Sequence, residues 1–196
     1  MQLVILILAA GSSSRMDTIK QLLKIEGKTL IENAIETSMK IKNTSILCVL
    51  GAHAAEIKKK VDLSSVDVTI NKDYELGLSS SIISGIKHLQ KQKNQFDGIF
   101  LLLADQPAIK LAYYQEMVTL FSKEKKKIIA SKYENGFGVP AIFPKSFIKN
   151  LLEIRGDKGA KEFLHKNKKE ILSPKTLVNL VDIDTPKDYK SYLNTL

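Results

Sequence analysis

A short loop near the start of the chain has the residue types that bind phosphate. It reads Gly11-Ser12-Ser13-Ser14-Arg15 and follows the apolar run from Leu3 to Leu8 directly. Glycine permits a close backbone approach, and the N–H groups of a loop without bulky side chains can face an anion. Arginine adds a planar, permanently charged group that can bind two phosphate oxygens at once. The segment therefore predicts a phosphate-binding loop at the end of a first strand.

The composition makes these arginines informative. The chain has 30 lysines and arginines, of which only Arg15 and Arg155 are arginine. Because lysine supplies most of the positive charge, an arginine indicates a need for its bidentate geometry. Arg155 also lies beside a glycine, in Arg155-Gly156-Asp157. A functional role is favoured for Arg15, whereas for Arg155 a functional role and a chance placement both stay open.

A carboxylate follows a second apolar run. Asp105 comes after the run from Ile99 to Leu103 and is followed by Gln106 and Pro107. At the carboxyl end of a buried strand, beside a phosphate-binding loop, such a carboxylate is well placed to hold Mg²⁺ on a nucleotide. The alternative is an aspartate that starts a turn or caps a helix before proline. Its position favours the metal role.

Two further aspartates lie near the end of the chain, where Asp182 and Asp184 alternate before Thr185 and Pro186. In a strand end, residues two apart point to the same face. Carboxylates from distant parts of the chain would form a cation site, because Mg²⁺ prefers a few carboxylates together with phosphate oxygens and water. Thr185 and Pro186 are typical of a helix start, so capping of the last helix is an equal alternative for Asp182.

Lys20 differs from the other lysines by its position, five residues beyond Arg15. A positive charge there can contact an α-phosphate and stabilise charge in a transition state. A solvated surface position is the alternative for every lysine in this chain. The three histidines, His53, His88 and His165, are scattered on predicted helices and are interpreted as surface or helix-end residues.

Several classes of protein are excluded or disfavoured. The glycine-serine loop is neither a Walker A motif nor Gly-x-Gly-x-x-Gly, which argues against a kinase-type P-loop and a dinucleotide dehydrogenase. The single cysteine, Cys48, excludes an intrachain disulfide and a cysteine zinc site. A net charge of +9 suits an anionic partner, but the lysine clusters lack interleaved aromatic residues, so we expect no nucleic-acid binding. The first apolar run is too short to span a bilayer, so we expect no membrane association and a cytoplasmic protein.

Strand-like and helical segments alternate along the chain. Strands are expected at 2–8, 45–50, 66–70, 97–103, 128–131, 139–143 and 177–183, and helices at 29–42, 53–61, 79–92, 109–124, 145–152, 157–167 and 186–194. This order predicts an α/β fold in one domain, residues 1–196, with a mainly parallel sheet covered by helices on both faces. Within it, residues 128–143 predict a strand–loop–strand excursion. Ser79, Ser80 and Ser81 offer caps to the helix that follows. The loops 9–20, 71–79, 104–108 and 133–140 are expected to meet at one edge of the sheet.

Together the motifs resemble the nucleotidyltransferases with a MobA-like fold, and most of all the molybdenum cofactor cytidylyltransferases. The resemblance is carried by Leu8-Ala-Ala-Gly-Ser-Ser-Ser-Arg-Met16 with Lys20-Gln-Leu-Leu23, Leu103-Ala-Asp-Gln-Pro107, Gly138-Val-Pro-Ala-Ile-Phe143, Gly156-Asp-Lys-Gly159 and Asp182-Ile-Asp-Thr-Pro186. It implies a Rossmann-like three-layer sandwich of the nucleotide-diphospho-sugar transferase type. It also implies Mg²⁺-dependent transfer of CMP from CTP to the phosphate of a molybdopterin-type cofactor, with release of pyrophosphate.

The resemblance also assigns residues to roles. It implies a catalytic role for Arg15, Lys20 and Asp105, and Mg²⁺ binding by Asp105 and Asp184. Nucleotide binding is implied for Leu8, Ala9, Ala10, Gly11, Ser12, Ser13, Ser14, Ser80 and Ser81. Acceptor binding is implied for Gly138, Pro140, Gly156 and Asp157. One position departs from the family, which usually has glycine after Arg-Met where this chain has Asp17. An acidic residue there weakens triphosphate binding unless it turns outward or pairs with Lys20.

Three functions therefore remain open. The first is cytidylyl transfer to a molybdopterin-type cofactor, with a molybdoenzyme as a possible recipient of the product. The second is nucleotidyl transfer to another phosphorylated metabolite, such as a sugar phosphate or lactate phosphate. The third is a non-catalytic nucleotide-binding protein that hands a cofactor to an enzyme, an alternative that the departure at Asp17 keeps open.

Overall fold

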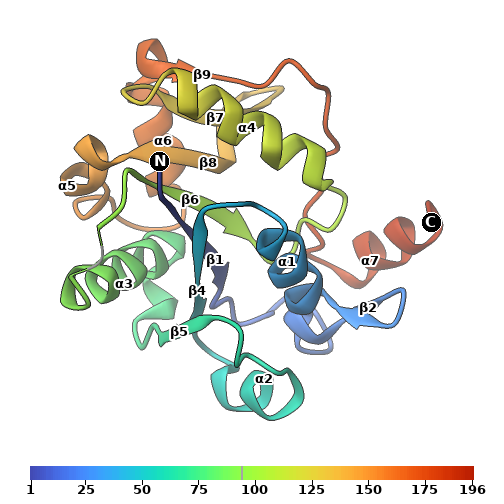
Figure 1. Ribbon diagram of the computed structural model, residues 1–196. Helices are drawn as coiled ribbons and strands as arrows, with labels where there is room; N and C mark the ends of the chain where they lie inside the picture. Colours follow the sequence, from blue (N-terminus) through green and yellow to red (C-terminus); the bar gives the residue numbers. More distant parts are fainter. Residues whose placement is uncertain (94) are drawn as a thin grey trace.

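A seven-stranded sheet forms the centre of the protein (Figure 1), in a computed structural model that describes residues 1–93 and 95–196. Its strand order is β5-β4-β1-β6-β8-β7-β9. The strands are β1 (Leu3–Ala9), β4 (Thr44–Leu50), β5 (Asp67–Ile70), β6 (Gly98–Leu103), β7 (Ile128–Tyr133), β8 (Gly136–Pro144) and β9 (Ile171–Leu172).

The middle of the sheet is parallel. β1 pairs in parallel with β4 on one side and with β6 on the other, and β5 pairs in parallel with β4. All seven residues of β1 are buried, as expected for a strand that is covered on both faces. The continuous apolar run at the start of the sequence therefore predicted this strand correctly.

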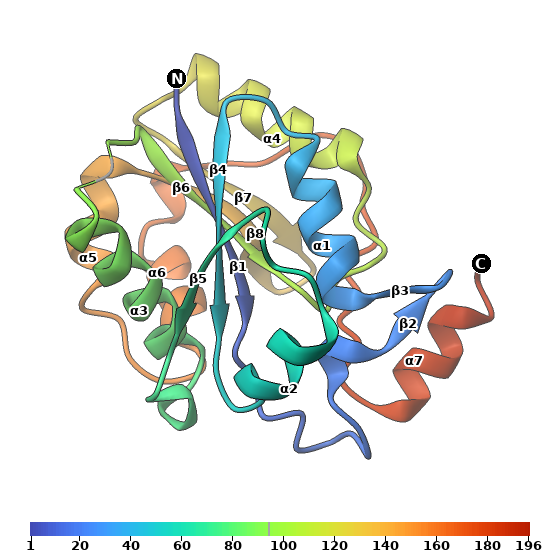
Figure 2. The ribbon, with the colours of Figure 1, turned by 60° about the horizontal axis from the view of Figure 1, so that its bottom comes forward.

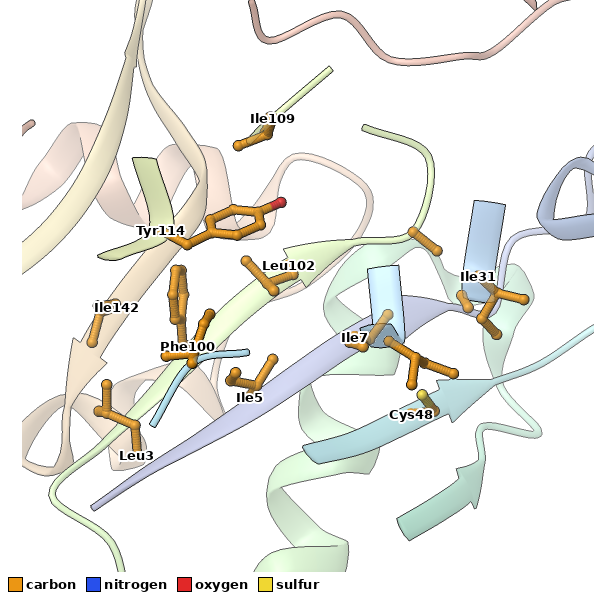
Figure 3. Packing of buried hydrophobic residues seen from close by; sticks show 14 of the residues in the cluster. Leu3, Ile5, Ile7, Ile31, Cys48, Phe100, Leu102, Ile109, Tyr114 and Ile142 are labelled. Carbon is orange, nitrogen blue, oxygen red and sulfur yellow. The ribbon is translucent and has the colours of Figure 1, made fainter. Parts of the chain in front are cut away.

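Helices cover both faces of the sheet. They are α1 (Leu30–Met39), α2 (Ala54–Lys60), α3 (Leu78–Lys91), α4 (Leu111–Lys123), α5 (Ile148–Leu151), α6 (Gly159–Lys166) and α7 (Pro186–Leu193), with 3-10 turns η1 (Lys20–Leu22), η2 (Tyr74–Leu76), η3 (Lys145–Phe147) and η4 (Lys168–Glu170). Alternate residues of β1 point to opposite faces. Leu3, Ile5 and Ile7 pack in a cluster with residues of α1, α2 and α4 (Figure 3). Val4, Leu6 and Leu8 pack in a second cluster with residues of α3, α5 and α6. These layers confirm the Rossmann-like α/β sandwich.

One strand runs against the others. β8 pairs antiparallel with both β6 and β7, which confirms the strand–loop–strand excursion expected between residues 128 and 143.

A second, two-stranded sheet was not predicted. It is a hairpin of β2 (Lys24–Ile25) and β3 (Lys28–Thr29), and its two turn residues, Glu26 and Gly27, have φ angles of 50° and 86°. Positive φ at both positions is what a type I′ hairpin turn requires. Strands of two residues show no periodicity in a sequence.

The strand expected at 177–183 is absent, so that prediction was wrong. The segment has no regular secondary structure, and β9 takes the edge beside β7 instead. Val178 and Leu180 pack on the cluster that contains the α4 residues, and the N–H of Lys175 donates to Glu116 of α4. The apolar pattern thus reflects packing over a helix rather than pairing in a sheet.

Among the described residues, no helix is long and apolar enough to cross a membrane.

The start of α3 also differs from its prediction. The helix begins at Leu78 after Gly77, so Ser79, Ser80 and Ser81 lie inside its first turn and do not cap it. The other predicted cap is confirmed, because the Thr185 side chain accepts from the N–H of Asp188 and Pro186 opens α7.

The order of the strands creates a switch point between β1 and β6. From β1 the chain moves to β4 and β5 on one side, and β6 then lies on the other side of β1 (Figure 2). In open α/β sheets, ligands bind beyond the carboxyl ends of the strands at such a point. The loops after Ala9 and Leu103 start there.

Gly51 lies close to the backbone of the first loop, and a substitution at this position tests how tightly the two pack. A Cβ at Gly51 would lie 2.4 Å from the carbonyl oxygen of Ala10, which is a backbone atom. We expect Gly51→Ala to lower the free energy of unfolding by about 1–3 kcal/mol, as overpacked sites do. Chemical denaturation followed by circular dichroism measures this difference.

The matched control is Gly11→Ala, where the nearest atom to an added Cβ is Nε2 of Gln21 at 3.9 Å. This variant should stay within about 0.5 kcal/mol of the parent protein. Equal stability losses in the two variants would contradict the tight contact between Gly51 and the loop.

Candidate active site

A pocket of about 740 Å³ opens at the switch point. Its wall is formed by the loops after β1 and β6, the first turn of α3 and the segment before α7. The residues expected to bind nucleotide that line it are Leu8, Ala9, Ala10, Gly11, Ser12, Ser13, Ser14 and Ser81. Ser80 lies behind this wall, where its Oγ donates to the carbonyl oxygen of Gly77. The structure thus brings most of these residues to one cavity.

The loop after β1 folds back on itself at Ser13. This residue has a φ of 55°, and its carbonyl accepts from the N–H of Met16 at 2.8 Å. Its Oγ accepts from the N–H of Lys20 at 3.0 Å. These two bonds return the chain toward the strand end, which places the side chain of Lys20 in the pocket beside Arg15.

Gln21 braces the same loop from inside. Its side chain is buried, and Nε2 donates to the carbonyl oxygens of Ala9 and Gly11 at 3.2 and 3.1 Å. A buried amide that binds two backbone carbonyls of one loop fixes the shape of that loop. Sequence reasoning did not single out Gln21. The only sign of Gln21 in the sequence is a polar residue between Lys20 and two leucines, and a single polar residue forms no periodic pattern.

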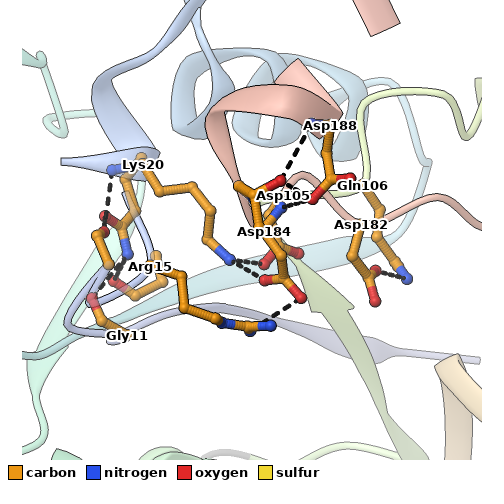
Figure 4. A network of polar contacts seen from close by, with 12 residues as sticks. Gly11, Arg15, Lys20, Asp105, Gln106, Asp182, Asp184 and Asp188 are labelled. Atoms are coloured by element: carbon orange, nitrogen blue, oxygen red, sulfur yellow. Dashed lines mark hydrogen bonds and ion pairs between the residues drawn. The ribbon is translucent and has the colours of Figure 1, made fainter. Parts of the chain in front are cut away.

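The ammonium of Lys20 joins two carboxylates from distant parts of the chain (Figure 4). Nζ lies 2.6 Å from Oδ2 of Asp105 and 2.9 Å from Oδ1 of Asp184. Arg15 contacts the other oxygen of Asp184, with 3.0 Å between Nη2 and Oδ2. Because Asp105 and Asp184 contact one nitrogen, their nearest oxygens cannot lie farther apart than these two distances together. The two carboxylates are therefore close enough to share one cation.

The charges of this cluster stabilise one another. Burial alone would lower the pKa of Lys20, but the negative charges and hydrogen bonds of Asp105 and Asp184 hold it above its ordinary value. Burial alone would raise the pKa of Asp184, but Lys20 and Arg15 hold it below its ordinary value. Lys20 and Asp184 are therefore both charged at neutral pH.

Asp182 has different partners. Gln106 donates from Nε2 to Oδ1 of Asp182 at 2.7 Å and to the hydroxyl of Tyr133 at 3.0 Å. The hydroxyl of Tyr133 in turn donates to the carbonyl oxygen of Val139. Burial and the neighbouring charge of Asp105 raise the pKa of Asp182 to about 6. Asp182 lines the pocket without contacting Lys20, and Gln106 is a second buried amide that the sequence did not reveal.

The residues at this edge fit a divalent cation. Oδ1 of Asp105 is buried and has no hydrogen-bond partner among the described residues. Carboxylate oxygens are the ligands that Mg²⁺ prefers, and it usually binds through one or two of them together with substrate phosphates and water. In the part of the chain that the structure describes, no group of three or more metal-ligating side chains could hold an ion by itself. The pair of Asp105 and Asp184 therefore suits a metal that arrives with a phosphate ligand.

The residues expected to face an acceptor divide into two groups. Asp157 lines the pocket, and its Oδ1 accepts from the N–H of Leu78. Gly156, Gly138 and Pro140 do not line it, although the carbonyl oxygen of Gly156 accepts from the N–H of Ser79 at the start of α3. Gly138 lies against the ring of Tyr133, and Pro140 is buried with its carbonyl bound by Oγ of Ser131.

Asp17 takes no part in the charged cluster of Lys20, Asp105 and Asp184. It is exposed and forms no ion pair within residues 1–93 and 95–196. Lys20 pairs with Asp105 and Asp184 instead. The structure therefore meets one of the two conditions under which an acidic residue at this position leaves the loop able to bind phosphate.

Comparisons with known proteins agree with this geometry. Residues 5–171 match the family described as MobA-like NTP transferase domain. The purine catabolism protein PucB of Bacillus subtilis is 27% identical, over 93% of this chain and 91% of that protein. The molybdenum cofactor cytidylyltransferase of Escherichia coli is 23% identical, over 94% and 92%. The crystal structure of Rv0371c from Mycobacterium tuberculosis aligns with a TM-score of 0.86 and 26% identity, over 98% of this chain and 97% of that one.

The position of Lys20 between two carboxylates predicts its contribution to stability. In Lys20→Met, Asp105 and Asp184 lose their common cation and repel each other. Removal of one partner from a fully buried ion pair costs about 3–5 kcal/mol, and partial exposure reduces this, so we expect a loss of about 1–3 kcal/mol. Urea denaturation in EDTA measures it without a divalent cation replacing the ammonium.

Arg15→Met is the control. The Arg15 side chain is 66% exposed, and its one ion pair among the described residues is with Asp184, so this variant should lose no more than about 0.5 kcal/mol. An unchanged stability of Lys20→Met would show that the ammonium does not hold the carboxylates together in solution.

Proposed function

The chain belongs to the MobA-like NTP transferase family and is a nucleotidyltransferase, and on that premise we propose that it transfers CMP from CTP to a molybdopterin-type cofactor. In this reaction a phosphate oxygen of the acceptor bonds to the α-phosphorus of CTP. The bond from that phosphorus to the oxygen bridging the α- and β-phosphates breaks, and pyrophosphate leaves. The observation that carries the proposal is the convergence of Arg15, Lys20, Asp105 and Asp184 beside the glycine-serine loop.

Positioning and charge neutralisation are what such a reaction needs from a protein. The loop of residues 10–14 would surround the triphosphate with backbone N–H groups, in a shape fixed by Gln21. Arg15 and Lys20 would bind phosphate oxygens and stabilise the charge of the leaving pyrophosphate. Both lie in the pocket wall with the loop.

The charge balance of the cluster supports a requirement for Mg²⁺. Two cations and two carboxylates come close to cancelling, so the cluster by itself offers a triphosphate little net positive charge. Asp105 and Asp184 would hold the metal, which when bound neutralises phosphate oxygens and polarises the α-phosphorus. The buried and unpartnered Oδ1 of Asp105 supports this assignment.

CTP and the molybdopterin-type acceptor are proposed from the sequence motifs. The form Leu8-Ala-Ala-Gly11 and the segment Gly77-Leu-Ser-Ser-Ser81 resemble the cytidylyl branch, and the similarity to the Escherichia coli cytidylyltransferase supports the same choice. Asp157 would face the acceptor from the pocket wall. Gly138 and Pro140 would act only indirectly, through Tyr133 and Gln106, and a molybdoenzyme would receive the product.

A panel of the four nucleoside triphosphates with Mg²⁺ tests the proposal by thermal denaturation. A ligand that binds only the folded state at 100 times its Kd stabilises it by about 2.7 kcal/mol, so CTP should raise the melting temperature by several degrees. The other three should raise it less. A larger shift with a purine nucleotide would contradict the choice of CTP.

The same protein should release pyrophosphate only when both CTP and the acceptor are present. Asp105→Asn should lower that rate at least about 100-fold, because a metal contact supplies several kcal/mol of transition-state stabilisation. The matched variant is Asp73→Asn, an exposed aspartate outside the pocket wall, which should retain the rate. Binding of CTP without turnover on a molybdopterin, sugar phosphate or lactate phosphate acceptor would indicate the non-catalytic alternative.

A further inference from the structure

A second cavity, of about 500 Å³, lies on the other side of the first turns of α3. We call it the α3 pocket. Its wall comes from residues 69–73 at the end of β5 and just after it, from α3, and from residues between 152 and 156 before α6. Arg155, the second arginine of the chain, lies in this wall, whereas Arg15 lies in the wall of the first pocket.

The α3 pocket carries an excess of positive charge. Lys72, Lys87, Lys91 and Arg155 line it, against the single carboxylate of Asp73. None of the three lysines forms an ion pair or a hydrogen bond through its side chain in the part of the chain that is described. The other intrachain ion pairs of lysine, such as Lys28 with Glu36, show that acidic partners are available elsewhere on the surface. Four cations around one cavity therefore remain available to an anion.

Arg155 is held by backbone rather than by an acid. Its Nη1 donates to the carbonyl oxygens of Leu152 and Ile154, at 3.2 and 2.7 Å. An arginine has five N–H donors, so this anchor fixes the guanidinium and leaves most of its donors for a ligand. A planar and anchored guanidinium suits phosphate oxygens, which it can bind in pairs.

The α3 pocket also offers apolar contact and an unsatisfied polar atom. Ile70 and Leu76 line it although they are 45% and 68% exposed, and Ile83 and Ile154 lie deeper. Nε2 of His88, another lining residue, is buried with no hydrogen-bond partner among the described residues. Exposed apolar side chains that gather at a cavity mark a binding site more often than isolated ones do.

We infer that the α3 pocket binds a small phosphomonoester with an apolar body, at a site distinct from the nucleotide pocket. The phosphate would lie among the lysines and Arg155, and the apolar part against Ile70 and Leu76. The two pockets share one structural element, because Gly156 and Asp157 accept hydrogen bonds from the first N–H groups of α3. A ligand in the α3 pocket would therefore contact the loop whose Asp157 lines the nucleotide pocket.

Isothermal titration with phenyl phosphate, inorganic phosphate and phenol tests this inference on the full chain. Phenyl phosphate should bind saturably, inorganic phosphate more weakly, and phenol not at all in the same concentration range. Lys72→Gln combined with Lys87→Gln should weaken phenyl phosphate binding about fivefold or more, because each charge contact contributes up to about 1 kcal/mol. Both lysines are exposed, so the folded structure should persist.

The matched control is Lys123→Gln with Lys125→Gln, which removes the same charge from the end of α4, on the opposite face of the sheet. It should leave binding unchanged. Amide chemical shifts locate the ligand. The amide resonances of Ser84, Lys87 and Lys91 should shift when it binds, and those of Gly11, Ser12 and Ser14 should not. Binding that survives the Lys72/Lys87 change but is lost in Arg15→Gln would place the ligand in the nucleotide loop and overturn the inference. Absence of saturable binding would overturn it as well, whether or not CTP binds the protein.

Discussion

The site depends on one interaction, the contact of the Lys20 ammonium with the carboxylates of Asp105 and Asp184. It joins the segment of Lys20 to two others, which lie 85 and 164 residues further along the sequence. The backbone supports it from both sides. β1 and β6 are neighbours in the parallel sheet, so their ends bring the first loop and Asp105 together. The N–H of Ile183 donates to the carbonyl oxygen of Asp105, which fixes the segment that carries Asp184.

The same interaction explains why the pocket suits a triphosphate. Two carboxylates at this distance would repel each other in the absence of a cation, and Lys20 and Arg15 now provide that charge. A divalent ion with two carboxylate ligands would relieve the same repulsion and bring additional positive charge for phosphate oxygens. The proposed metal site thus lies at the end of the loop that we propose to bind the triphosphate.

Much of the fold could be predicted from the sequence, because long apolar runs and periodic helices carry strong signals. The parallel strands β1, β4 and β6 and the strand–loop–strand excursion through β7 and β8 were predicted. The short strands were not, since β2, β3 and β9 have two residues each. The segment 177–183 shows the opposite error, because packing of Val178 and Leu180 over α4 produces the same apolar pattern as a strand.

Asp184 follows no strand, so the strand order did not predict its position. The convergence of Arg15, Lys20 and Asp105 could be anticipated because loops after parallel strands meet at one edge. The groups that hold this arrangement could not, because Gln21 and Gln106 act through buried amides that have no spacing rule. The positions of Gly138 and Pro140 also depend on tertiary structure, since Gly138 lies against the ring of Tyr133 and Pro140 is buried beside Ser131. Charge and periodicity thus indicate where a site lies. The residues that hold the site in shape by hydrogen bonds can be identified only in the folded structure.

The most direct test of the central claim is a crystal structure of the protein with CTP and Mn²⁺, in which anomalous scattering locates the metal. We expect a manganese peak within bonding distance of carboxylate oxygens of both Asp105 and Asp184, with the triphosphate against residues 10–15. A metal bound to neither aspartate, or a triphosphate bound outside this loop while Lys20 still joins the two carboxylates, would contradict it.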